Sequence, residues 1–131
     1  KYIITGNNRD INRYRWNQKV ILNQLKNSKS KQSIFYKNLT NLLSIRSKQK
    51  AFHPNALRTT INMGSKIFCF QRTSIDKRQK IMCITNLSSR ERYLLLSKRF
   101  KNCKNLINQK IHILPNKKLK LDPFQTIWLS N

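Results

Sequence analysis

The side chains that could carry out acid–base chemistry are scarce in this sequence. Its 131 residues include only four acidic ones against 28 lysines and arginines, which gives a formal net charge of +24. The four acids, Asp10, Asp76, Glu91 and Asp122, lie far apart along the chain. Catalysis by paired carboxylates and metal binding by carboxylates both need acidic groups that lie close together. We therefore expect neither in this chain, and we predict no metal site and no cofactor.

One of the four acids lies within a run that is dense in planar hydrogen-bonding groups, Thr5–Trp16. In this run Asp10 directly follows Arg9, and Arg13 comes soon after. A guanidinium group can hold a carboxylate through two parallel hydrogen bonds, and it can also donate to sugar hydroxyls. The simpler interpretation is a polar loop ahead of a helix, with Asp10 paired locally. The spacing of the residues leaves both interpretations open.

The cysteines and histidines give little sign of chemistry. Cys69, Cys83 and Cys103 form no CxxC pair, and their odd number favours reduced thiols in the cytoplasm. We expect Cys69 and Cys83 to be buried, because they lie in apolar runs. His53 precedes a proline and is expected to be structural, whereas His112 is expected to face solvent from a strand. No apolar stretch has the length of a membrane span, so we expect no membrane partner.

The first part of the chain has the pattern of helices. We predict one short amphipathic helix over Asn17–Leu25 and a second, capped by Ser33, over Ile34–Gln49. The second helix carries apolar residues at helical spacing: Phe35, Leu39, Leu42, Leu43 and Ile45. A polar loop, 26–31, separates the two helices. We expect Trp16 to be buried at the start of the first helix.

After residue 51 the apolar pattern changes to a period of two, which indicates strands. Six strand candidates follow one another: Arg58–Met63, Lys66–Thr73, Lys80–Leu87, Arg92–Leu96, Lys118–Leu121 and Gln125–Ser130. Short strands at this spacing favour a small antiparallel sandwich. We expect Trp128 to be buried in the last strand. We therefore predict a helical segment, 1–51, followed by an all-β domain, 52–131.

The motifs resemble those of sucrose phosphorylases and their relatives in glycoside hydrolase family 13, the α-amylase family. Thr5–Arg13 resembles the Thr-Gly-x-x-Arg-(Glu/Asp)-Ile-Asn-Arg run that precedes a late barrel helix in those enzymes. Leu42–Arg46 is similar to the end of their final barrel helix, and Ala51–Ala56 to the crossing into their C-terminal β-domain. Leu121–Leu129 resembles the last strand of that domain. The resemblance covers nearly the whole chain in the right order.

This resemblance implies an α+β fragment, made of the last loop and helices of a (β/α)8 barrel and then a small antiparallel β-sandwich. The parent would be a retaining enzyme that transfers glucose from sucrose, or a similar small α-glucoside, to inorganic phosphate. Its catalytic aspartate and glutamate would precede Lys1, so we expect no catalytic residue in this chain and no activity from the chain alone. Arg9 would close the glucose pocket and bind the sugar, with Arg13 as the second choice. The upstream barrel would be the partner of the β-domain.

Two other hypotheses remain open at the level of sequence. The charge of the chain suits a basic nucleic-acid-binding protein, and it makes nonspecific polyanion binding possible. Its basic residues are nevertheless spread through both halves, without a known nucleic-acid-binding motif. The β-domain could instead be a non-catalytic remnant or a carbohydrate-binding module. A binding module should carry aromatic residues on one exposed strand face, and the sequence does not clearly show such a face.

Overall fold

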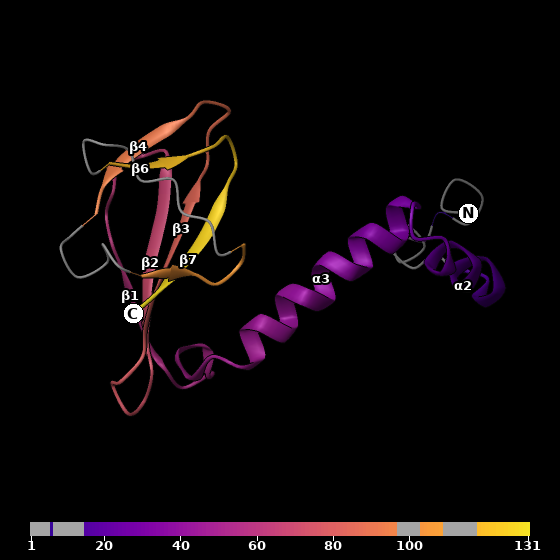
Figure 1. Cartoon of the computed structure of the whole chain (residues 1–131), viewed down its shortest axis with the longest axis horizontal. Helices are drawn as coiled ribbons and strands as arrows, with labels where there is room; N and C mark the ends of the chain where they lie inside the picture. Colours follow the sequence, from indigo (N-terminus) through magenta and orange to yellow (C-terminus); the bar gives the residue numbers. More distant parts are fainter. Residues whose placement is uncertain (1–5, 7–14, 97–102, 109–117) are drawn as a thin grey trace. The chain divides into compact units, whose positions relative to one another are not determined.

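The chain forms two compact units, Lys1–Asn41 and Leu42–Asn131. The computed structural model describes residue 6 and residues 15–96, 103–108 and 118–131. The α-helices lie in the first part of the described chain and the strands in the second (Figure 1). The division between barrel segment and β-domain that the sequence suggests after residue 51 stays a prediction.

The two helices begin at side-chain caps. Helix α2 spans Gln18–Lys26, and the side chain of Asn17 accepts hydrogen bonds from the first backbone N–H groups of the helix, at 2.9 Å from Lys19. Helix α3 spans Lys31–Ser47. Its cap is Ser30, whose Oγ accepts from the backbone N–H of Ser33 at 3.0 Å. The predicted cap at Ser33 is therefore wrong, because the hydroxyl of Ser30 is placed to bind that N–H and the helix begins earlier.

Neither helix buries a residue. The apolar residues that the sequence assigns to one face of α3 are largely exposed, with Phe35 at 68% and Leu43 at 51%. Trp16 is 56% exposed, so its predicted burial is wrong. No helix among the described residues is long and apolar enough to cross a membrane. The helices thus present apolar side chains without a core of their own.

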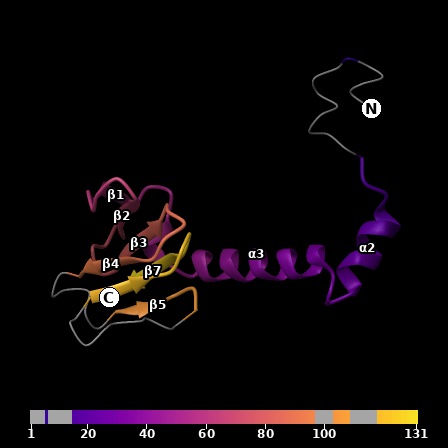
Figure 2. The same ribbon diagram turned by 90° about the horizontal axis from the view of Figure 1, so that it is seen from above.

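The second unit is built on an antiparallel sheet with the strand order β1-β2-β3-β7-β5. Its strands are β1 (Leu57–Thr60), β2 (Ile67–Thr73), β3 (Lys80–Asn86), β7 (Thr126–Ser130) and β5 (Lys104–Asn105). Strand β5 lies beside β7 (Figure 2). A second, two-stranded antiparallel sheet pairs β4 (Arg92–Leu95) with β6 (Lys118–Leu121).

The main core lies between the two sheets. It consists of alternate residues of the larger sheet together with Leu119 and Leu121 of β6 and Cys103. The residues that the larger sheet supplies are Ile67, Cys69, Met82, Ile84, Ile127 and Leu129. Ile84 and Leu129 are fully buried. Because strand side chains alternate between faces, the register that fills this core turns the intervening residues to the opposite face.

The opposite face of the larger sheet holds a smaller cluster. Ala51, Ile81 and Cys83 are buried there, and Phe52 and Trp128 pack against them. Trp128 is only partly buried, so its predicted burial is confirmed only in part. Ala51 and Phe52 belong to a 3-10 helix, η2 (Lys50–Phe52), that follows α3. The predicted antiparallel β-rich region is confirmed, whereas the barrel segment stays a prediction.

Candidate functional site

The sugar-binding residues that the sequence suggests, Arg9 and Arg13, lie outside the described residues. Asp10, between them, does too. Their predicted role therefore stays a prediction. The other three carboxylates of the chain are described, and each has a structural environment that can be tested for chemistry.

Asp76 organises the turn between β2 and β3. Its Oδ1 accepts from Ser74 Oγ at 2.6 Å and from the backbone N–H of Arg78 at 3.1 Å. Lys50 Nζ lies 3.4 Å from Oδ2. The hydrogen bond from Ser74, followed by the bond from Arg78, lowers the pKa of Asp76 to about 2. A carboxylate held ionised in this way stabilises a turn and cannot donate a proton at neutral pH.

Glu91 and Asp122 are far apart in sequence and are brought to the same ammonium group. Lys120 Nζ lies 2.5 Å from Glu91 Oε1 and 3.6 Å from Asp122 Oδ1. Tyr93 Oη donates to Glu91 Oε2 at 2.7 Å. The hydrogen bond from Lys120, together with the one from Tyr93, lowers the pKa of Glu91. A general acid near neutral pH needs a raised carboxyl pKa, so this cluster does not suit acid–base catalysis.

The buried thiols are equally unsuited to chemistry. Burial raises the pKa of Cys83 to about 12 and that of Cys69 to about 11. All three cysteines are buried, as predicted for Cys69 and Cys83. Within the described ranges, no group of three or more histidines, cysteines or carboxylates could hold a metal ion.

The segment after α3 is held to the sheet by two polar side chains. Arg72 of β2 donates from Nε to the carbonyl of Ala51 at 3.1 Å and from Nη2 to the carbonyl of His53 at 2.5 Å. Gln79 Oε1 accepts from the backbone N–H of Ala51 at 3.0 Å. His53 Nδ1 accepts from the backbone N–H of Asn55 at 3.2 Å, which supports the structural role expected for this histidine.

Beside this junction lies a hollow of about 390 Å³, which we call the arginine–aromatic hollow. Its lining includes three arginines and three aromatic residues: Arg46, Arg58, Arg72, Phe52, Phe70 and Trp128. The strand register assembles them, because Arg58 lies opposite Arg72 and Phe70 lies opposite Cys83, which in turn lies opposite Trp128. The ring of Phe52 packs against Trp128 with centroids 4.8 Å apart.

The aromatic row continues beyond the hollow. Phe68 is 47% exposed, and its ring centroid lies 5.4 Å from that of Phe70. Phe68 and Phe70 are two residues apart on β2 and so share one face, to which Trp128 is added through β3. The sequence analysis found no clear row of aromatic residues on one strand face, whereas the structure places three of them on one face of the sheet. The i, i+2 spacing of the phenylalanines is the sequence signal that could have revealed it.

No protein-family model matches the chain. Glucosylglycerate phosphorylase from Spirochaeta thermophila is 29% identical over 84 residues, which amount to 64% of this chain and 14% of that protein. Trehalose-6-phosphate hydrolase from Bacillus licheniformis matches in structure with a TM-score of 0.57 and 21% identity, over 82% of this chain and 19% of that one. Trehalulose synthase from Pseudomonas mesoacidophila MX-45 matches with a TM-score of 0.56 and 17% identity, over 83% of this chain and 19% of that one.

These structural neighbours are barrel enzymes with a C-terminal β-domain, and the small antiparallel β-rich fold of this chain is consistent with part of theirs. Glucosylglycerate phosphorylase and these structural neighbours are members of glycoside hydrolase family 13, so the resemblance of the chain to that family is confirmed. It spans 14% of the length of the phosphorylase that it matches and about a fifth of each structural neighbour.

Proposed function

We propose that the chain is the C-terminal portion of a retaining glucoside phosphorylase or glucosyltransferase that acts on sucrose or a similar small α-glucoside. The observation that carries this proposal is the likeness to glucosylglycerate phosphorylase over 84 residues. The acceptor would be inorganic phosphate. Residues 1–51 would form the C-terminal end of the catalytic barrel, and residues 52–131 would form the accessory β-domain.

Each of the three described carboxylates is engaged in a local interaction. Asp76 is bound within a turn, while Glu91 and Asp122 are bridged by Lys120. A retaining glycosidase needs one carboxylate as nucleophile and a second, with a raised pKa, as acid and base. The proposal therefore places both groups in the upstream barrel, which would be the partner of the β-domain in a cytoplasmic enzyme.

The proposed contribution of this chain to the active site is Arg9, with Arg13 as the alternative. A guanidinium group at the end of a glucose pocket can donate several hydrogen bonds in fixed directions, both to a carboxylate across the pocket and to sugar hydroxyls. Such a group would limit the pocket to one terminal glucose and hold that sugar in position.

Steady-state kinetics of the parent enzyme test this role. We expect Arg9→Ala to lower kcat/KM for the glucoside by about 10- to 100-fold, the range given by the loss of a charge-assisted hydrogen bond. Arg15→Ala, which removes an arginine of the same segment, is the matched control and should change kcat/KM less than about twofold. An unchanged catalytic efficiency in Arg9→Ala, with Arg13→Ala impaired, would move the role to Arg13.

The chain on its own provides the second test. Because its described carboxylates form no suitable catalytic pair, we expect no release of glucose 1-phosphate from sucrose or glucosylglycerate in the presence of phosphate. Detectable glucosyl transfer by the purified 131-residue chain would overturn the proposal as a whole.

A further inference from the structure

The arginine–aromatic hollow has a strongly positive lining. No described carboxylate lines this hollow. Asp76 accepts a hydrogen bond from Ser74, and Glu91 and Asp122 are bridged by Lys120. Arg72 is committed to the carbonyl groups of Ala51 and His53. Arg46 and Arg58 form no ion pair among the described residues. Two guanidinium groups are thus available to an anion in a chain of net charge +24.

The same face offers rings as well as charge. Phe70 and Trp128 line the hollow on strands separated only by β3, so their backbones lie roughly 10 Å apart. Phe68 extends the row on the side of β2, and it is exposed. A polyanion without rings would bind the arginines and make no use of these aromatic side chains. A ligand that alternates negative charges with flat rings would use both.

We propose that the arginine–aromatic hollow binds single-stranded nucleic acid, with phosphates at Arg46 and Arg58 and bases against Phe68, Phe70 and Trp128. Proteins that bind single strands without sequence preference combine a positively charged groove with aromatic side chains on which bases stack. This inference goes beyond the proposed enzyme function and does not depend on it. It concerns the 131-residue chain itself, and it gives some of the excess basic side chains a binding role.

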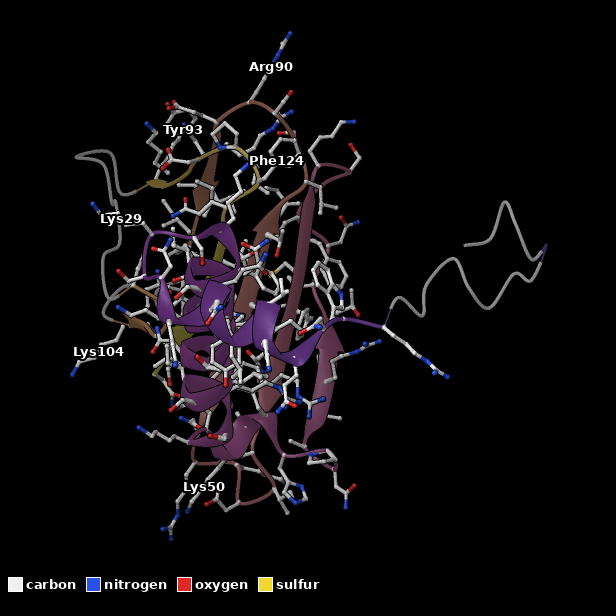
Figure 3. All side chains as sticks on the ribbon, turned by 90° about the vertical axis from the view of Figure 1, so that its right-hand side faces the viewer. Lys29, Lys50, Arg90, Tyr93, Lys104 and Phe124 are labelled. Atoms are coloured by element: carbon white, nitrogen blue, oxygen red, sulfur yellow. The ribbon has the colours of Figure 1, made fainter. Side chains whose placement is uncertain are left out.

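The basic side chains elsewhere on the β-rich unit provide an internal control. Lys50, Arg90 and Lys104 point outwards at separate places on this unit (Figure 3). Arg90 and Lys66 line a different hollow near Phe124, at the end of the sheet away from the η2 junction. Removing two cations there changes the total charge as much as removing two from the arginine–aromatic hollow.

The first experiment measures binding of a fluorescent 20-nucleotide oligo-dT to the intact chain by anisotropy, between about 50 and 300 mM salt. We expect the double variant Arg46→Ser/Arg58→Ser to bind at least tenfold more weakly at the lowest salt concentration. The slope of log K against log salt should become shallower by roughly 1.4, since each lost phosphate contact on a single strand removes about 0.7. The control Lys66→Ser/Arg90→Ser, which also lowers the net charge to +22, should lose less than threefold.

The second experiment follows the aromatic residues in a Trp16→Phe background, where Trp128 is the remaining tryptophan. We expect oligo-dT to quench the Trp128 fluorescence, and heparin, which carries no bases, to bind without that quench. Phe68→Leu, a change at an exposed position, should weaken oligo-dT binding severalfold while leaving heparin binding unchanged. Circular dichroism melts show whether each variant keeps its fold.

Three results would overturn the proposal. Equal losses in the two double variants would mean that net charge alone holds the oligonucleotide. An equal quench of Trp128 fluorescence by heparin would show that the bases do not cause the quench. Tighter binding of poly-glutamate than of oligo-dT, with the same quench, would instead identify the face as a docking surface for an acidic protein. None of these results bears on the kinetics of Arg9→Ala, so the two proposals fail separately.

Discussion

The helices and the β-rich unit share a lysine- and asparagine-rich composition, yet they use their apolar residues in opposite ways. Neither α2 nor α3 buries a residue, whereas β3 buries five of its seven positions. In the strands, a period of two divides the apolar residues between two faces, and each face meets other residues of the same unit. In α3 the apolar residues meet no such partner among the described residues.

This difference indicates that most of the stability of the chain comes from the β-rich unit. Packing of an apolar face, rather than intrinsic propensity, supplies most of the stability of helices in proteins. The β-rich unit contains its own core, so it should carry the cooperative unfolding transition. Helices α2 and α3 should contribute little to that transition in the isolated chain.

The largest expected effect comes from truncating the core. Ile84→Ala removes a fully buried side chain between the two sheets, and we expect it to lower the free energy of unfolding by about 2–5 kcal/mol. Leu39→Ala removes a side chain of α3 that is 41% exposed, and it should change stability by less than about 0.5 kcal/mol. Urea unfolding of the intact chain measures both values. Comparable losses of unfolding free energy in the two variants would contradict the view that the β-rich unit supplies most of the stability.

A smaller loss is expected from a buried polar residue. Asn86 is fully buried, and its Nδ2 donates to the carbonyls of Arg90 and Asp122 at 2.8 and 2.9 Å. Asn86→Ala leaves these carbonyls without that donor, which should cost about 1–3 kcal/mol in urea unfolding.

The matched control for Asn86 is Asn41→Ala, at an exposed position of α3. We expect it to leave stability unchanged or to raise it slightly, because alanine favours helix more than asparagine does. Destabilisation by both asparagine variants would show that the helix also contributes side-chain contacts to the folded state.

The smallest expected effect depends on pH. The pKa of Asp76 is lowered in the folded chain from 3.8 to about 2, so its stabilising contribution is present above pH 4 and is lost as pH falls towards 2. The contribution is small because the carboxylate is exposed. The urea midpoints of the wild-type chain and Asp76→Asn should therefore differ slightly at pH 6 and converge near pH 2. A difference that persists unchanged at pH 2 would contradict the role assigned to ionised Asp76.

The regular elements of the chain could largely be predicted from its sequence. Each of the six strand candidates corresponds to an observed strand, with ends that differ by a few residues. The structure also contains a strand that the sequence analysis missed, β5 (Lys104–Asn105). A strand of two residues has no readable alternation, and it exists here because β7 provides a pairing edge from far along the chain.

The arginine–aromatic hollow was harder to predict, for a physical reason. Arg58 and Arg72 share a face through the pairing of β1 with β2, and Trp128 joins Phe70 only through the intervening β3. These relations depend on register, which local patterns do not specify. Burial of Trp16 was predicted from its apolar character alone, and that prediction failed because no core forms around the helices among the described residues.

The position of β7 has a consequence for biosynthesis. Thr126–Ser130 follows the other described strands of this sheet in the sequence, yet it pairs with β3 on one side and β5 on the other, in the interior of the sheet. A ribosome must therefore translate β7 before the sheet can close, and until then the edge of β3 stays available to other strands. A nonsense codon just before residue 126 would leave the sheet without its link between β3 and β5.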